Sequence, residues 1–338
     1  MTGNGLAIEI PMDGHLGLML PWHKPQWENP MEEKREYGAA VQRNTGKKRW
    51  RDRYDGRRLM HTDTFFTLIP YIMSTRNDSQ VAASFKIDVT NVERYLRKRR
   101  QDGSPIGQDL TFLDVVMASI VRMISQKPYV NRFIAGHKAF ARDELSISLA
   151  IKKDLSVEGT QTVVKVAYDP TDTIFDVAVR LQREIEKNKD VKTDNTTDSF
   201  AKFVNHLPSG LIRFVIGTIK WLDFHGWMPQ AVQRLSPFHC SVFVTAMGSI
   251  NFAPIYHHIY NFGTCSAFIA YGPKYSEMVL QRDGSAIERK FIDFKIVGDE
   301  RICDGFGMAS AWKEMMRCIK HPELLEKPPE TVMQDHGI

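Results

Sequence analysis

The chain has 338 residues, 43% hydrophobic and 25% charged, which is typical of a soluble globular protein long enough to bury a sizeable core. Residues 1–10 lack the basic and apolar regions of a signal peptide, and no run of 18 apolar residues occurs, so we predict a cytoplasmic protein without a transmembrane helix. The net charge of +5 is concentrated in residues 34–58, whose local balance is +7, whereas the rest of the chain sums to about −2.

The first sixty residues, 1–60, have the composition of an extension and include this basic segment. Four prolines, scattered glycines and the aromatic Trp22 and Trp27 indicate a segment that docks on something and is not wholly disordered. The basic part is typical of a solvated arm; alternatively it packs on a neighbouring subunit or meets phosphates. No nucleic-acid-binding motif accompanies the charge, so we predict no nucleic-acid partner.

From residue 61 to about 328 the pattern is that of one globular domain, and 329–338 form a tail. Apolar spacing and turn residues predict, in chain order, a helix over 65–73 broken by Pro70, a strand over 81–89, helices over 91–100 and 111–126, strands over 145–151 and 162–167 that can form a hairpin, and a helix over 174–187. Thr111 has the character of an N-cap, with Asp114 completing a weak capping box.

Residues 200–235 form an unusually apolar stretch that Arg213, Lys220 and Asp223 interrupt. One or two buried helices are the simplest interpretation. The alternatives are an interfacial helix at a membrane and a lid over an apolar acyl pocket.

In the last part of the domain, the apolar pattern predicts strands over 241–247, 266–271 and 291–297 and a helix over 306–319. Strands and helices are mixed without regular alternation, which favours an α+β fold with a mixed sheet. The four cysteines have no metal-ligand spacing, so we expect reduced thiols and no metal site.

The most informative block is D-E-R-I-C-D-G at residues 299–305, followed by a helix and then by H-P-E-L-L at 321–325. It resembles the D-H-R-x-x-D-G and x-P-x-x-L-L signature of dihydrolipoyl acyltransferases, the catalytic domains of 2-oxo acid dehydrogenase complexes, and the H-H-x-x-x-D-G motif of chloramphenicol acetyltransferases. Three earlier blocks occur in the order of that superfamily: 84–90, 110–131 and 241–255. The resemblance implies a chloramphenicol acetyltransferase-like α/β two-layer sandwich, with a mixed sheet covered by helices.

The resemblance also implies how the chemistry is divided. In that family a homotrimer forms each active site between two subunits, and the pantetheine arm of coenzyme A enters from one side. The histidine of the motif is the general base, and a hydroxyl from the block at 241–255 stabilises the oxyanion. Thr245 stands at the hydroxyl position, and Asp304 is the motif aspartate, expected to orient the local backbone.

The chain departs from the family at the base, where Glu300 replaces the histidine. Three hypotheses remain open. Glu300 is a base whose pKa is raised by an apolar channel; or the base is His257 or His258; or the fold is kept without the chemistry. If 256–260 formed a strand, the two histidines would point to opposite faces and at most one would face the site.

The sequence therefore predicts an acyltransferase that moves an acyl group from acyl-CoA to a thiol, hydroxyl or amine, with no metal cofactor. No lipoyl domain is present, so we expect a free-standing enzyme with a small-molecule or lipid acceptor. Its partners would be copies of itself, as a homotrimer or larger assembly, with peripheral membrane contact as a further option. The alternative is a catalytically inactive scaffold that keeps the trimer.

Overall fold

A computed structural model of the chain describes residues 49–60, 63–102, 109–152, 161–189 and 208–335. Most of the predicted N-terminal extension lies outside these residues, as do 200–207 of the apolar stretch and 336–338 of the tail.

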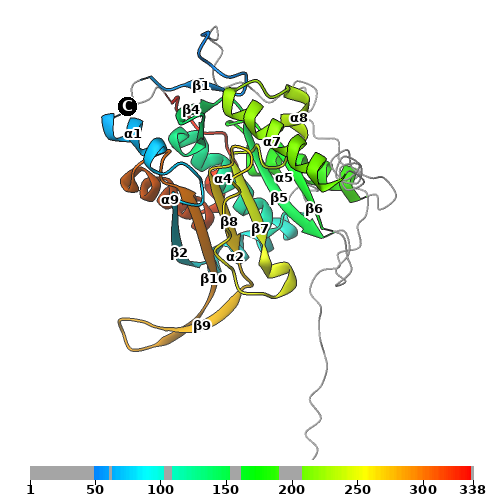
Figure 1. Ribbon diagram of the computed structural model, residues 1–338. Coiled ribbons are helices and arrows are strands. Elements are labelled where there is room, and N and C mark those ends of the chain that lie inside the picture. Colours follow the sequence, from blue (N-terminus) through cyan, green and yellow to red (C-terminus); the bar gives the residue numbers. More distant parts are fainter. Residues whose placement is uncertain (1–48, 61–62, 103–108, 153–160, 190–207, 336–338) are drawn as a thin grey trace, which may run out of the picture. The chain divides into compact units, whose positions relative to one another are not determined.

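The described chain forms seven α-helices and ten strands (Figure 1). The helices are α1 (Thr64–Ile72), α2 (Thr90–Gln101), α4 (Phe112–Gln126), α5 (Ile174–Lys189), α7 (Ser209–His225), α8 (Gln230–Leu235) and α9 (Gly305–Lys320). The strands are β1 (Gly56–Arg58), β2 (Gln80–Asp88), β3 (Arg132–Ala135), β4 (Lys138–Arg142), β5 (Leu145–Lys152), β6 (Gln161–Tyr168), β7 (Val242–Ala246), β8 (Ala267–Tyr271), β9 (Tyr275–Leu280) and β10 (Ala286–Asp299).

The main sheet has seven strands in the order β2-β10-β8-β7-β5-β6, with β9 paired to the outer part of β10. The pairs β5–β7 and β7–β8 are parallel and the remaining pairs are antiparallel. The predicted hairpin of β5 and β6 and the predicted mixed sheet are both confirmed.

Helices cover one face of this sheet, and the main core lies between the two layers (Figure 1). Ile120 of α4, Val244 of β7 and Phe294 of β10 are fully buried there. The start of α4 is fixed as predicted, because Thr111 accepts a hydrogen bond from the Asp114 amide while the Asp114 carboxylate accepts one from the Thr111 amide. The predicted two-layer α+β sandwich is confirmed.

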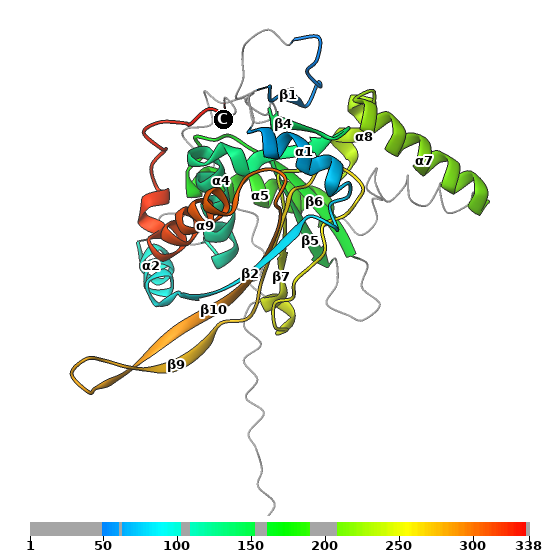
Figure 2. The ribbon, with the colours of Figure 1, turned by 60° about the vertical axis from the view of Figure 1, so that its left-hand side comes forward.

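Two features of the fold were not predicted. A second sheet has the order β1-β4-β3, and β1 lies within the residues assigned to the extension. The β9–β10 hairpin protrudes beyond the other strands in both ribbon views (Figures 1 and 2). Met278 and Leu280 of β9 are exposed, and the sequence YSEMVL of this strand does not alternate between apolar and polar residues, so it was not predicted as a strand.

The apolar stretch differs most from expectation. Its helical character is confirmed by α7 and α8, but no residue of α7 is buried. Phe214 is 70% exposed and Trp221 is 52% exposed, and Figure 2 shows α7 extending sideways from the sheet. Helix α1 also differs, since it continues through Pro70 to Ile72. None of the helices in the described ranges has the length and apolar character needed to span a bilayer.

Candidate active site

The loop over residues 299–305, here called the motif loop, joins the end of β10 to the start of α9. The Asp299 carboxylate and the Arg301 guanidinium form a bidentate ion pair, with Nε–Oδ1 at 2.8 Å and Nη2–Oδ2 at 2.7 Å. Both residues are at least 97% buried, because Asp299 is 0% exposed and Arg301 is 3% exposed. The pair therefore spans Glu300 and fixes the backbone on either side of it.

Other bonds hold the same loop to the body. The Glu300 amide donates to the carbonyl oxygen of Ser79 at 3.0 Å, and the Ser79 hydroxyl donates to Asp299 at 2.9 Å. Arg132 donates to the carbonyl of Ile302 at 3.2 Å and forms an ion pair with Asp335. Between these anchors the side chain of Glu300 is only partly buried, so it can meet a substrate.

Asp304 begins α9. Its side chain accepts a hydrogen bond of 2.7 Å from the amide of Gly307, and its backbone is extended, so it is the N-cap. The carboxylate is exposed. This geometry gives Asp304 a role in the local backbone and leaves the proton chemistry to other groups.

Thr245 lies near the end of β7, at the start of a tight turn that continues as the 3-10 helix Met247–Ile250. Its side chain is partly buried, and its hydroxyl contacts the sulfur of Met247 at 3.6 Å. The turn requires Gly248, because a Cβ atom there would lie 2.8 Å from the carbonyl oxygen of Gly272. The hydroxyl is thus presented at the end of a strand by a closely packed turn.

Thr245 and Glu300 lie at opposite ends of the same sheet. Thr245 pairs with Ala270 of β8, and Ala270 pairs with Lys295 of β10. Glu300 is five positions further along the chain from Lys295. Two strand spacings across and five residues along separate the two Cα atoms by about 20 Å. Within one subunit they cannot act on the same atom.

The two adjacent histidines lie on irregular backbone that crosses the sheet face opposite the helices. His257 stacks on Phe268 of β8 with ring centroids 4.1 Å apart, and its Nδ1 lies 2.8 Å from the carbonyl oxygen of His258. Nδ1 therefore carries the proton and Nε2 is left as an acceptor. Burial lowers the pKa of His257, which favours the neutral ring.

The expectation for a strand does not hold here, because the rings of His257 and His258 lie 4.6 Å apart instead of on opposite faces. His258 is exposed. The Ile259 amide donates to the Gln80 side chain at 3.3 Å, and Gln80 pairs with Asp299 across β2 and β10. The histidines and Glu300 therefore lie at the same end of the sheet, away from Thr245.

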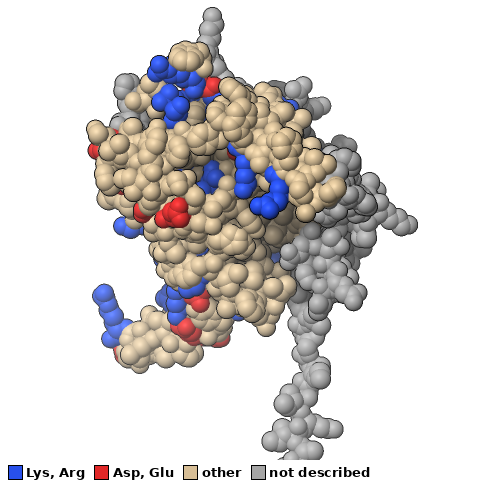
Figure 3. Space-filling model, in the orientation of Figure 1, with Lys and Arg blue, Asp and Glu red and all other residues tan. Residues whose placement is uncertain are grey.

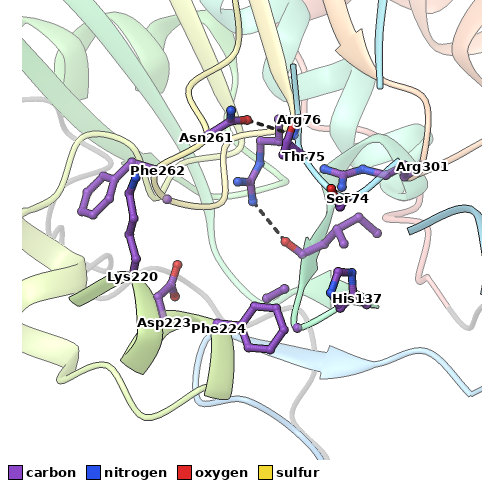
Figure 4. Close-up of a pocket in the computed structure, with 14 residues that line it drawn as sticks. Ser74, Thr75, Arg76, His137, Lys220, Asp223, Phe224, Asn261, Phe262 and Arg301 are labelled. Carbon is purple, nitrogen blue, oxygen red and sulfur yellow. Dashed lines mark hydrogen bonds between the residues drawn. The ribbon is translucent and has the colours of Figure 1, made fainter. Parts of the chain in front are cut away.

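A cavity of about 210 Å³, here called the Arg76 pocket, lies beside the motif loop (Figure 4). Arg301 forms part of its wall, together with Arg76, the turn between β3 and β4 with His137, and the end of α7 with Lys220 and Asp223. The predicted site residues do not line it. Its basic side chains come from four separate parts of the chain, so no sequence motif predicted that they lie together.

No family model and no curated protein matches the sequence. Among solved structures, a dihydrolipoamide acetyltransferase from Azotobacter vinelandii matches with a TM-score of 0.50 and 13% identity, over 76% of this chain and 90% of that one. The chain has the chloramphenicol acetyltransferase-like fold. At this identity the likeness shows the fold alone.

Two further solved structures are similar to this chain at lower TM-scores. A probable dihydrolipoamide acetyltransferase from Listeria monocytogenes is 16% identical over 81% of this chain and 97% of its own, with a TM-score of 0.49. A chloramphenicol acetyltransferase is 10% identical over 75% of this chain and 94% of its own, with a TM-score of 0.43. The resemblance predicted from the motif blocks is confirmed at the level of fold, which is one that acyltransferases have.

The chloramphenicol acetyltransferase-like fold thus carries the predicted site residues as two separate groups. Glu300, His257 and His258 lie at one end of the sheet, and Asp304 caps the helix that follows the motif loop. Thr245 lies at the other end.

Proposed function

We propose that the protein is a CoA-dependent acyltransferase whose active site forms between two copies of the chain in a homotrimer. The observation that carries this proposal is the separation of Thr245 from Glu300 along one sheet, in a fold that acyltransferases have. In a closed ring each subunit meets its two neighbours through two different surfaces, and in the proposed trimer these surfaces are the two ends of its sheet. Each contact then contains one Thr245 and one Glu300.

Exposed apolar side chains at both ends support such a contact. Ile250, Phe252 and Tyr256 follow Thr245 and are 52%, 53% and 49% exposed. Phe306 follows the motif loop and is 83% exposed. Much of the surface drawn in Figure 3 is formed by uncharged residues. Large exposed apolar patches on a monomer are typical of surfaces that another chain covers.

Coenzyme A would lie in the same contact. The Arg76 pocket, at about 210 Å³, is smaller than the roughly 300–1,000 Å³ of sites for drug-sized ligands, so it cannot enclose a whole acyl-CoA. A channel between two subunits supplies the missing length. This also fits the absence of Thr245 and Glu300 from the lining of the pocket.

The reaction is transfer of the acyl carbon from sulfur to the acceptor. The acceptor thiol, hydroxyl or amine attacks the thioester carbonyl, and Glu300 removes its proton. The hydroxyl of Thr245 from the adjacent subunit donates to the oxyanion of the tetrahedral intermediate. The carbon–sulfur bond then breaks, and the proton held by Glu300 passes to the CoA sulfur, which leaves as the thiol.

The Azotobacter enzyme supports these assignments, since a serine, a histidine and an asparagine four positions after the histidine have roles in its catalytic mechanism. Glu300 and Asp304 have the same four-residue spacing, and Thr245 offers a hydroxyl as serine does. His257, neutral with Nε2 free to accept, is the alternative base.

Calorimetric titration of the full chain with CoA and with acyl-CoAs from acetyl to long-chain tests the proposal. We expect micromolar binding that varies with acyl length, because the acyl group enters an apolar contact. Adenosine 3′,5′-bisphosphate is the matched control ligand, since it has the nucleotide but no pantetheine arm, and we expect it to bind at least about tenfold more weakly. Absence of binding by every CoA species would contradict the proposal.

One observation favours a second function. Glu300 stands where the family has its histidine, so the trimer could be kept as a scaffold without chemistry. That function predicts a stable oligomer with no affinity for any acyl-CoA. The same titration, combined with the molar mass in solution, separates the two.

A further inference from the structure

The Arg76 pocket has chemistry that acyl transfer by Glu300 and Thr245 does not use. Figure 4 shows the Arg76 guanidinium reaching into the middle of the cavity, with Lys220 on the opposite side and His137 and Phe224 below. In the orientation of Figure 3, Lys and Arg atoms are visible in and beside a hollow near the centre of the face.

Arg76 is a buried cation with little to balance it. Its side chain donates from Nη2 to the carbonyl oxygen of Ile134 at 3.0 Å, and its Nε is buried without an acceptor. Among the described residues no carboxylate forms an ion pair with it, although the residue is only 8% exposed. Burial lowers the pKa of its guanidinium, and an unpaired buried charge is costly.

The carboxylates near Arg76 already form ion pairs with other residues. Asp299 is committed to Arg301 in the motif loop. Asp223, the one carboxylate among the described residues that line the pocket, pairs with Arg53 at 2.7 Å and bonds His239 at 3.3 Å. Although burial alone would raise it, the bond to His239 and the charge of Arg53 hold the pKa of Asp223 below its usual range.

The positive charge of Arg76 inside the cavity and that of Lys220 at its rim are therefore not balanced by any carboxylate of the described residues. An anion between them would balance both charges and accept hydrogen bonds from the part of the Arg76 guanidinium that lines the cavity. The remaining wall contains Phe224, Phe262 and Ile134, which favour an anion with an organic part over an inorganic one.

His137 is a further polar group in the wall of the pocket. Its Nδ1 lies 2.8 Å from the carbonyl oxygen of Pro70 and so carries the proton, which leaves Nε2 as an acceptor when the ring is neutral. The ring is held by stacking on Tyr71 at 4.9 Å and by an edge contact with Phe224 at 5.3 Å. Gly136 and His137 both have positive φ, as a tight two-residue turn requires, so the ring position is fixed by the hairpin.

We propose that the Arg76 pocket binds a small organic carboxylate, with the carboxylate between Arg76 and Lys220 and a hydroxyl or amine of the same molecule able to donate to His137. Because Arg301 lines the pocket and is adjacent to Glu300, this molecule is the acyl acceptor or part of it. That assignment rests on the proposed function, whereas binding of the carboxylate does not.

The test measures binding alone, on the full chain without acyl-CoA. Acetate, lactate, succinate, benzoate and inorganic phosphate are titrated by calorimetry and by thermal unfolding. We expect one or more of the carboxylates to bind and to raise the unfolding temperature, and phosphate to bind at least about tenfold more weakly. Arg76→Gln and Lys220→Gln should each weaken carboxylate binding by at least about tenfold.

Arg289→Gln is the matched control, because Arg289 pairs with Asp88 on the surface of β10 and does not line the pocket. It should leave binding unchanged. Lys220 is exposed, so its variant folds even if the Arg76 variant does not. Failure of every carboxylate to bind, preference for phosphate, or unchanged binding in Lys220→Gln would each overturn the proposal. Carboxylate binding by a protein that binds no acyl-CoA in the titration described above would support the pocket and contradict the proposed acyltransferase function.

Discussion

Replacing Glu300 by glutamine is expected to lower the turnover number for acyl transfer by about 10²–10⁴-fold, the usual contribution of a positioned general base. The amide keeps the size of the side chain and cannot take the acceptor proton. Because the Asp299–Arg301 pair and the Ser79 carbonyl fix the backbone of Glu300, the variant should fold and should bind acyl-CoA within a few-fold of the original. The measurement is the rate at which acyl-CoA releases free CoA in the presence of an acceptor that the unmodified protein uses, followed by chromatography.

Glu323→Gln is the matched control, since Glu323 is exposed and pairs only with the exposed His321 among its described neighbours. It should leave the rate unchanged. Retention of full activity by Glu300→Gln, with loss in His257→Gln, would transfer the role of base to His257. Retention in both would remove both residues from the chemistry.

Replacing Asp299 by alanine is expected to lower the free energy of unfolding by about 3–5 kcal/mol, the range found when one partner of a buried ion pair is removed. Asp299 is 0% exposed, and its loss leaves the Arg301 guanidinium buried and unpaired. It also removes the acceptor of the Ser79 hydroxyl. Urea unfolding at a fixed protein concentration measures the change, since self-association adds its own stability.

The control is Arg289→Ala, which breaks the ion pair with Asp88 on the surface of the sheet. Exposed pairs contribute about 0–1 kcal/mol, so we expect a small change. A double variant, Asp299→Ala with Arg301→Met, should recover part of the lost stability because no charge is left buried. Equal losses for Asp299→Ala and Arg289→Ala would show that the motif loop is not held by this pair.

The parts of the fold that the sequence predicted have local signals. The start of α4 was read from Thr111 and Asp114, which bond each other within four residues. The β5–β6 hairpin follows from alternation on two neighbouring strands. The order of the seven strands was not predicted, because nothing within one strand specifies its partners.

The sequence predicted less well which apolar residues are buried and by what. The composition of residues 200–235 predicted burial, yet α7 packs only partly against the β3 end of the fold. A hydrophobic helix is consistent with a core, an interface or a pocket wall, and Phe224 of α7 lines the Arg76 pocket. The composition of a segment indicates that its side chains favour burial, but it does not identify the surface that buries them.

The candidate site shows the same limit. Glu300, Thr245 and Asp304 were found from the motif blocks, but their separation could be read only from the strand register. Arg76, Lys220 and His137 carried no signal in the sequence. Their meeting depends on the turn before β2, the β3–β4 hairpin and α7, three elements distant along the chain.

Complementation between two inactive variants tests the shared active site most directly. Glu300→Gln and Thr245→Val are made separately, unfolded together in equal amounts and refolded, so that their subunits mix. Each variant alone should have little activity. In the mixture, about a quarter of the subunit contacts join an intact Glu300 to an intact Thr245, so about a quarter of the original activity should return. No recovery, with mixed oligomers verified by mass, would contradict a site built from two copies of the chain.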